Sequence, residues 1–110
     1  MPDIITTREF DNLIIVDLPE RVLKGGQDIR LKAKLLDVAE KRKNVGVNMK
    51  ETAYIDSGIV TALLSAEKQI SRYGKKLYII NPSSQARELF TITSVNRIIP
   101  VIDSEQELQA

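Results

Sequence analysis

The stretch Tyr54-Ile55-Asp56-Ser57-Gly58, followed by Ile59-Val60-Thr61-Ala62-Leu63-Leu64, decides the fold, because an extended apolar segment stops at an acid and a helix starts at a hydroxyl. Side-chain oxygens at such a junction accept hydrogen bonds from the free N–H groups of the first helical turn. The positive end of a helix also favours a phosphate. Ser57 is therefore expected either to cap this helix or to carry a modification, and Asp56 is the alternative cap.

The remaining sequence predicts strands and helices in alternation. Pro19 ends the second strand, the turn before it is Phe10-Asp11-Asn12, and Gly25-Gly26 breaks the loop over 20–26. Asn81-Pro82 indicates a helix start, with Asn81 as the cap and Pro82 in the first turn. Extended segments are expected at 4–7, 13–18, 45–49, 53–55, 77–80 and 98–102, and helices at 28–42, 57–73, from 82 onward, and over 104–108.

Helical periodicity defines which faces should be buried. In the helix over 57–73, apolar side chains recur on one face at Ile59, Leu63, Ala66, Ile70 and Tyr73. In the helix over 28–42 the pattern predicts a wide apolar face formed by Leu31, Leu35, Val38, Ile29, Ala33 and Leu36. Gly74 is expected to end the longer helix, and Lys41-Arg42-Lys43 is interpreted as a solvated helix end.

The order β-β-α-β-α-β-α-β, with a possible final helix, predicts an α/β fold. Strands that alternate with crossover helices form a mixed, largely parallel sheet with helices packed on it. Residues 1–110 are expected to form a single domain. Pro100 makes the segment over 98–102 an edge strand. Since functional groups gather beyond the carboxyl ends of strands in such sheets, Asp56 and Ser57 are expected there.

Composition excludes several functions. Sixteen basic and fifteen acidic residues leave a net charge of +1, which gives no general attraction to nucleic acid or to an anionic membrane. Histidine and cysteine are absent, so catalysis by Ser-His-Asp or Cys-His groups and zinc sites built on these residues are excluded. We therefore expect a cytoplasmic protein that is not an enzyme and that uses no metal or cofactor.

These residues are similar to those of a known family. The chain resembles the STAS domain, and most closely the bacterial anti-sigma factor antagonists, in which an extended segment is followed by Asp-Ser-(Ser/Ala)-Gly and a Leu-rich helix. Here the motif reads Tyr54-Ile55-Asp56-Ser57-Gly58-Ile59, so Gly58 and Ile59 stand where the family has Ser or Ala and then Gly. The turn Gly74-Lys75-Lys76 and the strand after it also resemble the family.

The resemblance implies an anti-sigma factor antagonist with the STAS fold. It implies that Ser57 is the phosphoacceptor, and that the partner is an anti-sigma factor with serine kinase activity. Phosphorylation would then end partner binding and so regulate transcription by a sigma factor. Asp56, Ser57, Gly58 and Thr61 are the expected partner-binding residues, and the oligomeric state stays open.

Two alternatives stay open. One is a receiver-like switch in which Asp56 is phosphorylated, although Asp11 and Asp17 are poorly placed to complete its Mg²⁺ site. The other is a STAS domain with another role, as a soluble subunit of a stress-signalling or lipid-transport complex or as a nucleotide-binding domain.

Overall fold

The chain folds around a five-stranded sheet. A computed structural model of the protein describes residues 5–19 and 27–109. The strands lie side by side in chain order, with the first pair antiparallel and the other three pairs parallel. This confirms the predicted mixed, largely parallel sheet. The strands are β1 (Thr6–Glu9), β2 (Leu13–Asp17), β3 (Asn44–Asn48), β4 (Leu77–Ile80) and β5 (Val101–Ile102).

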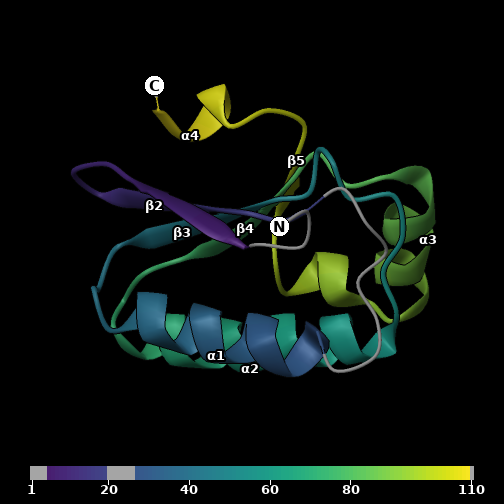
Figure 1. Cartoon of the computed structure of the whole chain (residues 1–110), viewed down its shortest axis with the longest axis horizontal. Helices are drawn as coiled ribbons and strands as arrows, with labels where there is room; N and C mark the ends of the chain where they lie inside the picture. Colours follow the sequence, from purple (N-terminus) through teal and green to yellow (C-terminus); the bar gives the residue numbers. More distant parts are fainter. Residues whose placement is uncertain (1–4, 20–26, 110) are drawn as a thin grey trace.

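Helices cover one face of this sheet, and a short C-terminal helix lies over the other (Figure 1). The elements are α1 (Gln27–Ala39), α2 (Ser57–Arg72), α3 (Ser84–Ile92), the 3-10 helix η1 (Val95–Arg97) and α4 (Gln106–Gln109). Helices α1 and α2 pack side by side beneath the strands. Each parallel connection crosses from the end of one strand to the start of the next, so the helices begin near the carboxyl ends of the strands.

The main core lies between the sheet and helices α1 to α3. The predicted stripe of α2 is buried at Ile59, Leu63, Ala66 and Ile70, and Tyr73 is half-buried at its C-terminal end. Gly74 follows with φ +73°, as a helix-ending glycine requires.

The apolar face predicted for α1 is too wide. Leu31, Leu35 and Val38 are buried as expected, and Leu36 is half-buried. Ile29 is 71% exposed, and Ala33 is also exposed. Leu31, Leu35 and Val38 pack into the main core, whereas Ile29 and Ala33 lie on the solvent side of the helix.

Other boundaries also differ from the prediction. Residues 53–55 form no strand, and only Ile55 makes an isolated bridge. Helix α3 is capped by Ser83, whose hydroxyl accepts from the Ala86 N–H at 3.2 Å, and not by Asn81. The last strand is only two residues long, and the Pro100 carbonyl before it accepts from the Ile79 N–H at 2.9 Å. The predicted loop over 20–26 lies outside the described residues.

The β1–β2 hairpin is confirmed, although β1 begins and ends two residues later than predicted. Its turn is closed by the Phe10 N–H, which donates to the Leu13 carbonyl at 2.7 Å.

Glu9, the last residue of β1, binds Lys41 at 2.9 Å and Lys43 at 2.8 Å. Hydrogen bonds from these two ammonium groups, chiefly from Lys43, lower the pKa of Glu9 to about 2. Lys41 and Arg42 are exposed, as expected of a solvated helix end, while Lys41 and Lys43 also form surface ion pairs with Glu9.

Candidate functional site

The N-cap of α2 is Asp56. Its backbone is extended (φ −115°, ψ −178°), and its carboxylate accepts a hydrogen bond from the Ile59 N–H at 3.2 Å. A cap in this position satisfies one of the backbone donors that have no partner within the helix. The structure thus decides between the two candidate caps, because Asp56 occupies the capping position and Ser57 is the first helical residue.

Ser57 is exposed at the first position of α2. Its side-chain hydroxyl has no hydrogen bond within the described residues. Its backbone carbonyl accepts from the Thr61 hydroxyl at 3.1 Å, so Thr61 lies one turn further along the same face of the helix and is also exposed. An unengaged hydroxyl at the positive end of a sixteen-residue helix is in an environment that favours an attached anion.

The other predicted partner-binding residue, Gly58, is only half-exposed. A Cβ atom at this position would lie 2.8 Å from Oδ2 of Asp28, a residue in the first turn of α1. The space beside Gly58 is therefore filled by a side chain of the same protein. Asp56, Ser57 and Thr61 are brought together at the start of α2, whereas Gly58 faces α1.

The segment before α2 is held by side chains from distant parts of the chain. Gln85 of α3 accepts from the Ile55 N–H at 3.0 Å and donates to the Ile55 carbonyl at 2.9 Å. The Ser83 hydroxyl donates to the Ala53 carbonyl at 3.0 Å. The Thr52 hydroxyl, the one buried polar side chain among the described residues, donates to the Pro19 carbonyl at 2.6 Å. These bonds fix the position of the segment from which Asp56 and Ser57 project. Tyr54, which lies between Ala53 and Ile55, is 44% exposed.

A second polar cluster lies where β2 and β3 end. Arg8 donates to both Asp17 oxygens at 2.7 and 2.8 Å and to both oxygens of Glu105 at 2.9 and 3.0 Å. Asn48 also donates to Asp17 at 2.8 Å. The Arg8 hydrogen bonds hold the pKa of Asp17 below its usual value, and the same contacts raise the pKa of Arg8. Every carboxylate in this cluster is paired, so it reads as a structural clamp between β1, β2 and the segment leading to α4.

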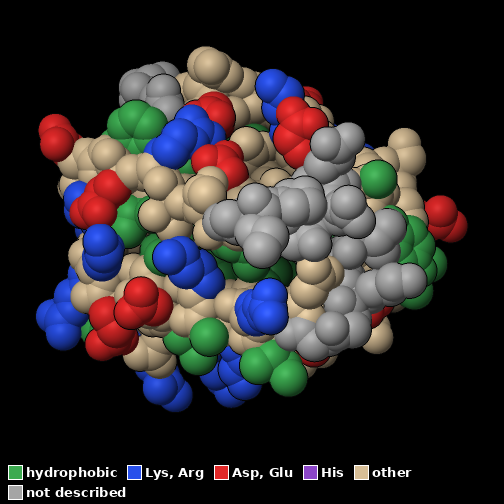
Figure 2. Space-filling model, viewed as in Figure 1, with side chains coloured by type: hydrophobic (Ala, Val, Ile, Leu, Met, Phe, Trp, Pro, Cys, Tyr) green, Lys and Arg blue, Asp and Glu red, His purple; other side chains and the backbone are tan. Residues whose placement is uncertain are grey.

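The described residues on the face shown in Figure 2 form no large patch of one charge. On the face seen in Figure 2, Lys and Arg side chains alternate with Asp and Glu. No group of three potential ligand residues able to hold a metal ion occurs within 5–19 and 27–109. None of the helices in these ranges combines the length and apolarity that a membrane span needs.

Two hollows lie away from Ser57. A hollow of about 740 Å³ lies between the start of the strands and α4, beside Phe10, Tyr78 and Leu108. A smaller one of about 270 Å³ lies near the carboxyl ends of β3 to β5, beside Asn48, Asn81 and Glu105. Neither includes Asp56, Ser57 or Thr61, so neither hollow is part of the candidate site.

A family model described as the STAS domain matches residues 5–108, and the chain belongs to this family. A protein from Thermotoga maritima, described as an anti-sigma factor antagonist, has 19% identity and a TM-score of 0.85, with 96% of this chain and 91% of that chain covered. An anti-sigma-factor antagonist (STAS) domain protein from Planctomyces limnophilus has 14% identity and a TM-score of 0.83, with 94% and 92% covered.

The anti-sigma factor antagonist SpoIIAA in its unphosphorylated form has 15% identity and a TM-score of 0.75, with 96% of this chain and 94% of that chain covered. The phosphorylated Bacillus SpoIIAA has 14% identity and a TM-score of 0.74, with 96% and 97% covered. A comparison with curated protein sequences finds no significant match. At these identities the likeness establishes the fold, and the fold is that of the anti-sigma factor antagonists.

The contacts of Gln85 and Asp28 and the exposure of Tyr54 could not be predicted from the sequence. Gln85 acts on a residue thirty positions away, and no local pattern announces such a contact. Asp28 lies at the expected start of the helix over 28–42, but no local pattern specifies its position beside Gly58 of another helix. The one sequence feature that pointed to this contact was Gly58. A glycine in the first turn of a helix lowers helix stability, so its presence suggests that a neighbouring group needs the space of the missing side chain.

Proposed function

We propose that this STAS protein is an anti-sigma factor antagonist whose binding to an anti-sigma factor with serine kinase activity is ended by phosphorylation of Ser57. The observation that carries the proposal is the division of roles at the start of α2. Asp56 caps the helix, and the Ser57 hydroxyl beside it is exposed and has no hydrogen bond within the described residues. A kinase can therefore phosphorylate the Ser57 hydroxyl while Asp56 continues to cap the helix.

The physical consequences of the modification favour a change in binding over a change in fold. Phosphorylation adds a charge of about −1.5 to −2 at neutral pH. At the first helical position this charge meets free N–H groups and the positive end of the helix dipole, so the protein itself tolerates it. A partner that contacts Asp56, Ser57 and Thr61 in the unmodified state would face new repulsion and desolvation. A penalty of about 1.4 kcal/mol for each lost contact lowers affinity about tenfold.

The test uses intact-mass spectrometry and binding measurements with the ATPase-type anti-sigma factors of the source organism. We expect one phosphate on the wild-type protein in the presence of Mg²⁺ and ATP, and none on Ser57→Ala. We expect Ser57→Glu to weaken binding by about tenfold to a hundredfold. Ser84→Glu is a matched control, because Ser84 is also the exposed first residue of a helix whose cap is the preceding residue.

The outcomes separate the proposal from its alternatives. A kinase that modifies a control substrate but leaves Ser57 unmodified contradicts the proposal, and so does undiminished binding by Ser57→Glu. A phosphate on Asp56 after treatment with acetyl phosphate and Mg²⁺ would favour the receiver-like switch. The engagement of the Asp56 carboxylate in the cap argues against that switch.

A further inference from the structure

The side chain of Asp28 fills the place that a side chain at residue 58 would take. An ideal Cβ built on Gly58 lies 2.8 Å from Oδ2, 3.1 Å from Cγ and 3.2 Å from Cβ of Asp28. The carboxylate of α1 therefore rests directly against the first turn of α2. Since Gly58 follows Ser57 in the chain, this carboxylate is within about one Debye length, ~8–10 Å, of any group attached to Ser57.

Asp28 differs from the other carboxylate at this corner. The Asp56 carboxylate is engaged by the Ile59 N–H. Asp28 is half-buried, yet it accepts no hydrogen bond and forms no ion pair within the described residues. Arg30 and Lys32 on the same helix are exposed and do not pair with it. The starts of α1 and α2 both favour its negative charge, but no cation within residues 5–19 and 27–109 forms an ion pair with it.

We infer that Asp28 is a specificity-determining residue of the Ser57 surface, and that the protein bound there neutralises its carboxylate with an Arg or Lys side chain. A partly desolvated carboxylate without a partner is costly, and a cation that approaches it gains more than it would at a fully exposed acid. The same carboxylate repels a phosphate on Ser57 and so makes the modified surface more negative than Ser57 alone would. The statement about the partner rests on the proposed function, whereas the charge coupling to residue 57 does not.

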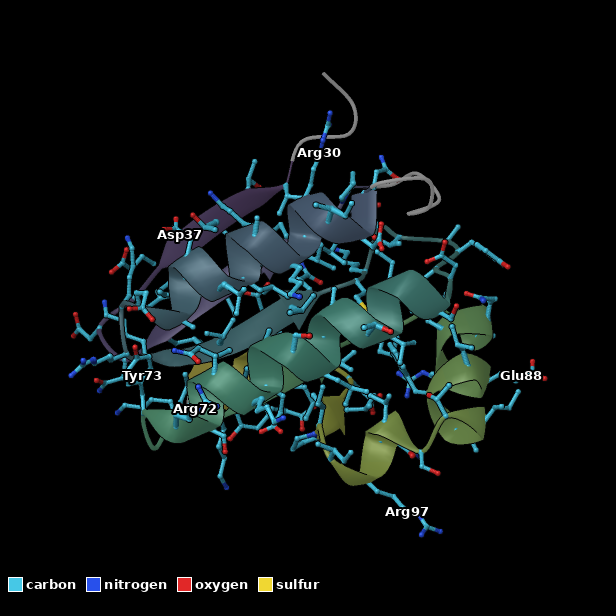
Figure 3. All side chains as sticks on the ribbon, turned by 90° about the horizontal axis from the view of Figure 1, so that it is seen from below. Arg30, Asp37, Arg72, Tyr73, Glu88 and Arg97 are labelled. Carbon is cyan, nitrogen blue, oxygen red and sulfur yellow. The ribbon has the colours of Figure 1, made fainter. Side chains whose placement is uncertain are left out.

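The coupling is tested on the protein alone, with a double-mutant cycle between Asp28→Asn and Ser57→Glu. Asparagine keeps the shape of the side chain and removes its charge. We expect Ser57→Glu to raise the urea midpoint more, or lower it less, in the Asp28→Asn background than in the wild type, with the difference reduced in high salt. Asp37→Asn is the matched control, because Asp37 is exposed toward the other end of α1 (Figure 3).

The partner is tested with the same variants and the anti-sigma factor that binds the wild type. We expect Asp28→Asn to weaken binding of the unphosphorylated protein about tenfold and to reduce its salt dependence, and Asp37→Asn to change neither. An equal effect of Ser57→Glu in both backgrounds overturns the inference. Unchanged binding by Asp28→Asn also overturns it, even where Ser57→Glu abolishes binding and the proposed function stands. If the double-mutant cycle shows coupling but no anti-sigma factor binds the wild-type protein, the proposed function is overturned. The inference that the partner supplies a cation is then overturned with it.

Discussion

Gln85 binds both peptide groups of Ile55, because its side-chain oxygen accepts from the Ile55 N–H at 3.0 Å and its nitrogen donates to the Ile55 carbonyl at 2.9 Å. A side-chain amide thus takes the place that a neighbouring strand would take beside Ile55. The side chain of Ile55 is buried in the main core, with 1% exposed. The residue before Asp56 is therefore fixed on both its backbone and its side chain.

Replacing Gln85 with Ala should destabilise the protein and loosen the start of α2. Two partly buried backbone groups would lose their partners, at a cost of about 1–3 kcal/mol for each group left without a hydrogen bond. Urea unfolding measures this loss, and hydrogen exchange should show faster exchange at the Ile55 amide. Glu88→Ala is the control, since Glu88 points away from α3 into solvent (Figure 3). Equal stability of the two variants would show that water replaces Gln85 without cost.

The division of roles between Asp56 and Ser57 predicts different effects of alanine at the two positions. Asp56→Ala removes the acceptor of the Ile59 N–H and should cost about 1 kcal/mol in the free energy of unfolding. Ser57→Ala should change it by less than about 0.5 kcal/mol. The same comparison at the start of α3 serves as the control, because Ser83 caps that helix and Ser84 is its first residue. A Ser57→Ala loss as large as that of Asp56→Ala would mean that Ser57 caps the helix in solution.

The parts of the fold that periodicity encodes could be predicted from the sequence. The buried stripe of α2 and the end of that helix at Gly74 follow from local spacing and backbone chemistry, and both are confirmed. The strands β2, β3 and β4 were predicted as apolar runs for the same reason. The exposure of Ile29 could not be predicted, because the rotation of α1 about its axis is set by its packing against α2.

The candidate site shows the same limit. The Asp-Ser junction at a helix start could be found from residues adjacent in the chain. The sequence could not show which of Asp56 and Ser57 caps the helix, because a shift of the helix start by one residue exchanges the two roles. The choice of Ser83 over Asn81 as the α3 cap reflects a positive φ of 50° at Asn81, which turns the chain before the helix begins. The contact between Asp28 and Gly58 joins two helices, and no local pattern specifies it.

The Arg8 cluster predicts a pH-dependent stability. The pKa of Asp17 is lower in the folded than in the unfolded protein, so its contribution is present above about pH 4, the unfolded pKa, and is lost as the pH falls through the lower folded pKa. Arg8→Gln should therefore cost up to about 1 kcal/mol at neutral pH, because the Arg8 side chain is 42% exposed and solvent screens the pair. Its stability should approach that of the wild type at lower pH. Chemical denaturation from pH 7 to acid measures both.

The control for this titration is Arg30→Gln, which removes an exposed arginine that makes no ion pair within the described residues. Its difference from the wild type should be small and should not depend on pH in the acid range. A constant difference between Arg8→Gln and the wild type at all pH values would show that Arg8 acts through the packing of its side chain and not through the Asp17 carboxylate.

Gly46 allows α4 to lie on the open face of the sheet. A Cβ at this position would be 2.7 Å from Cδ1 of Ile80, 3.1 Å from Cδ1 of Ile15 and 3.2 Å from Cδ1 of Leu108. Gly46→Ala should cost about 1–3 kcal/mol through overpacking. Leu108 belongs to a four-residue helix, so it can move more easily than the two strand residues.

A double-mutant cycle identifies which side chain gives way. If α4 is displaced, Leu108→Ala and Gly46→Ala should be non-additive by about 0.5 kcal/mol or more, because the second change no longer removes an intact contact. Leu64→Ala is the control, since Leu64 packs against the core on the other side of the sheet and should add independently. Additivity of Leu108 and Gly46 would place the strain within the sheet, at Ile80 and Ile15.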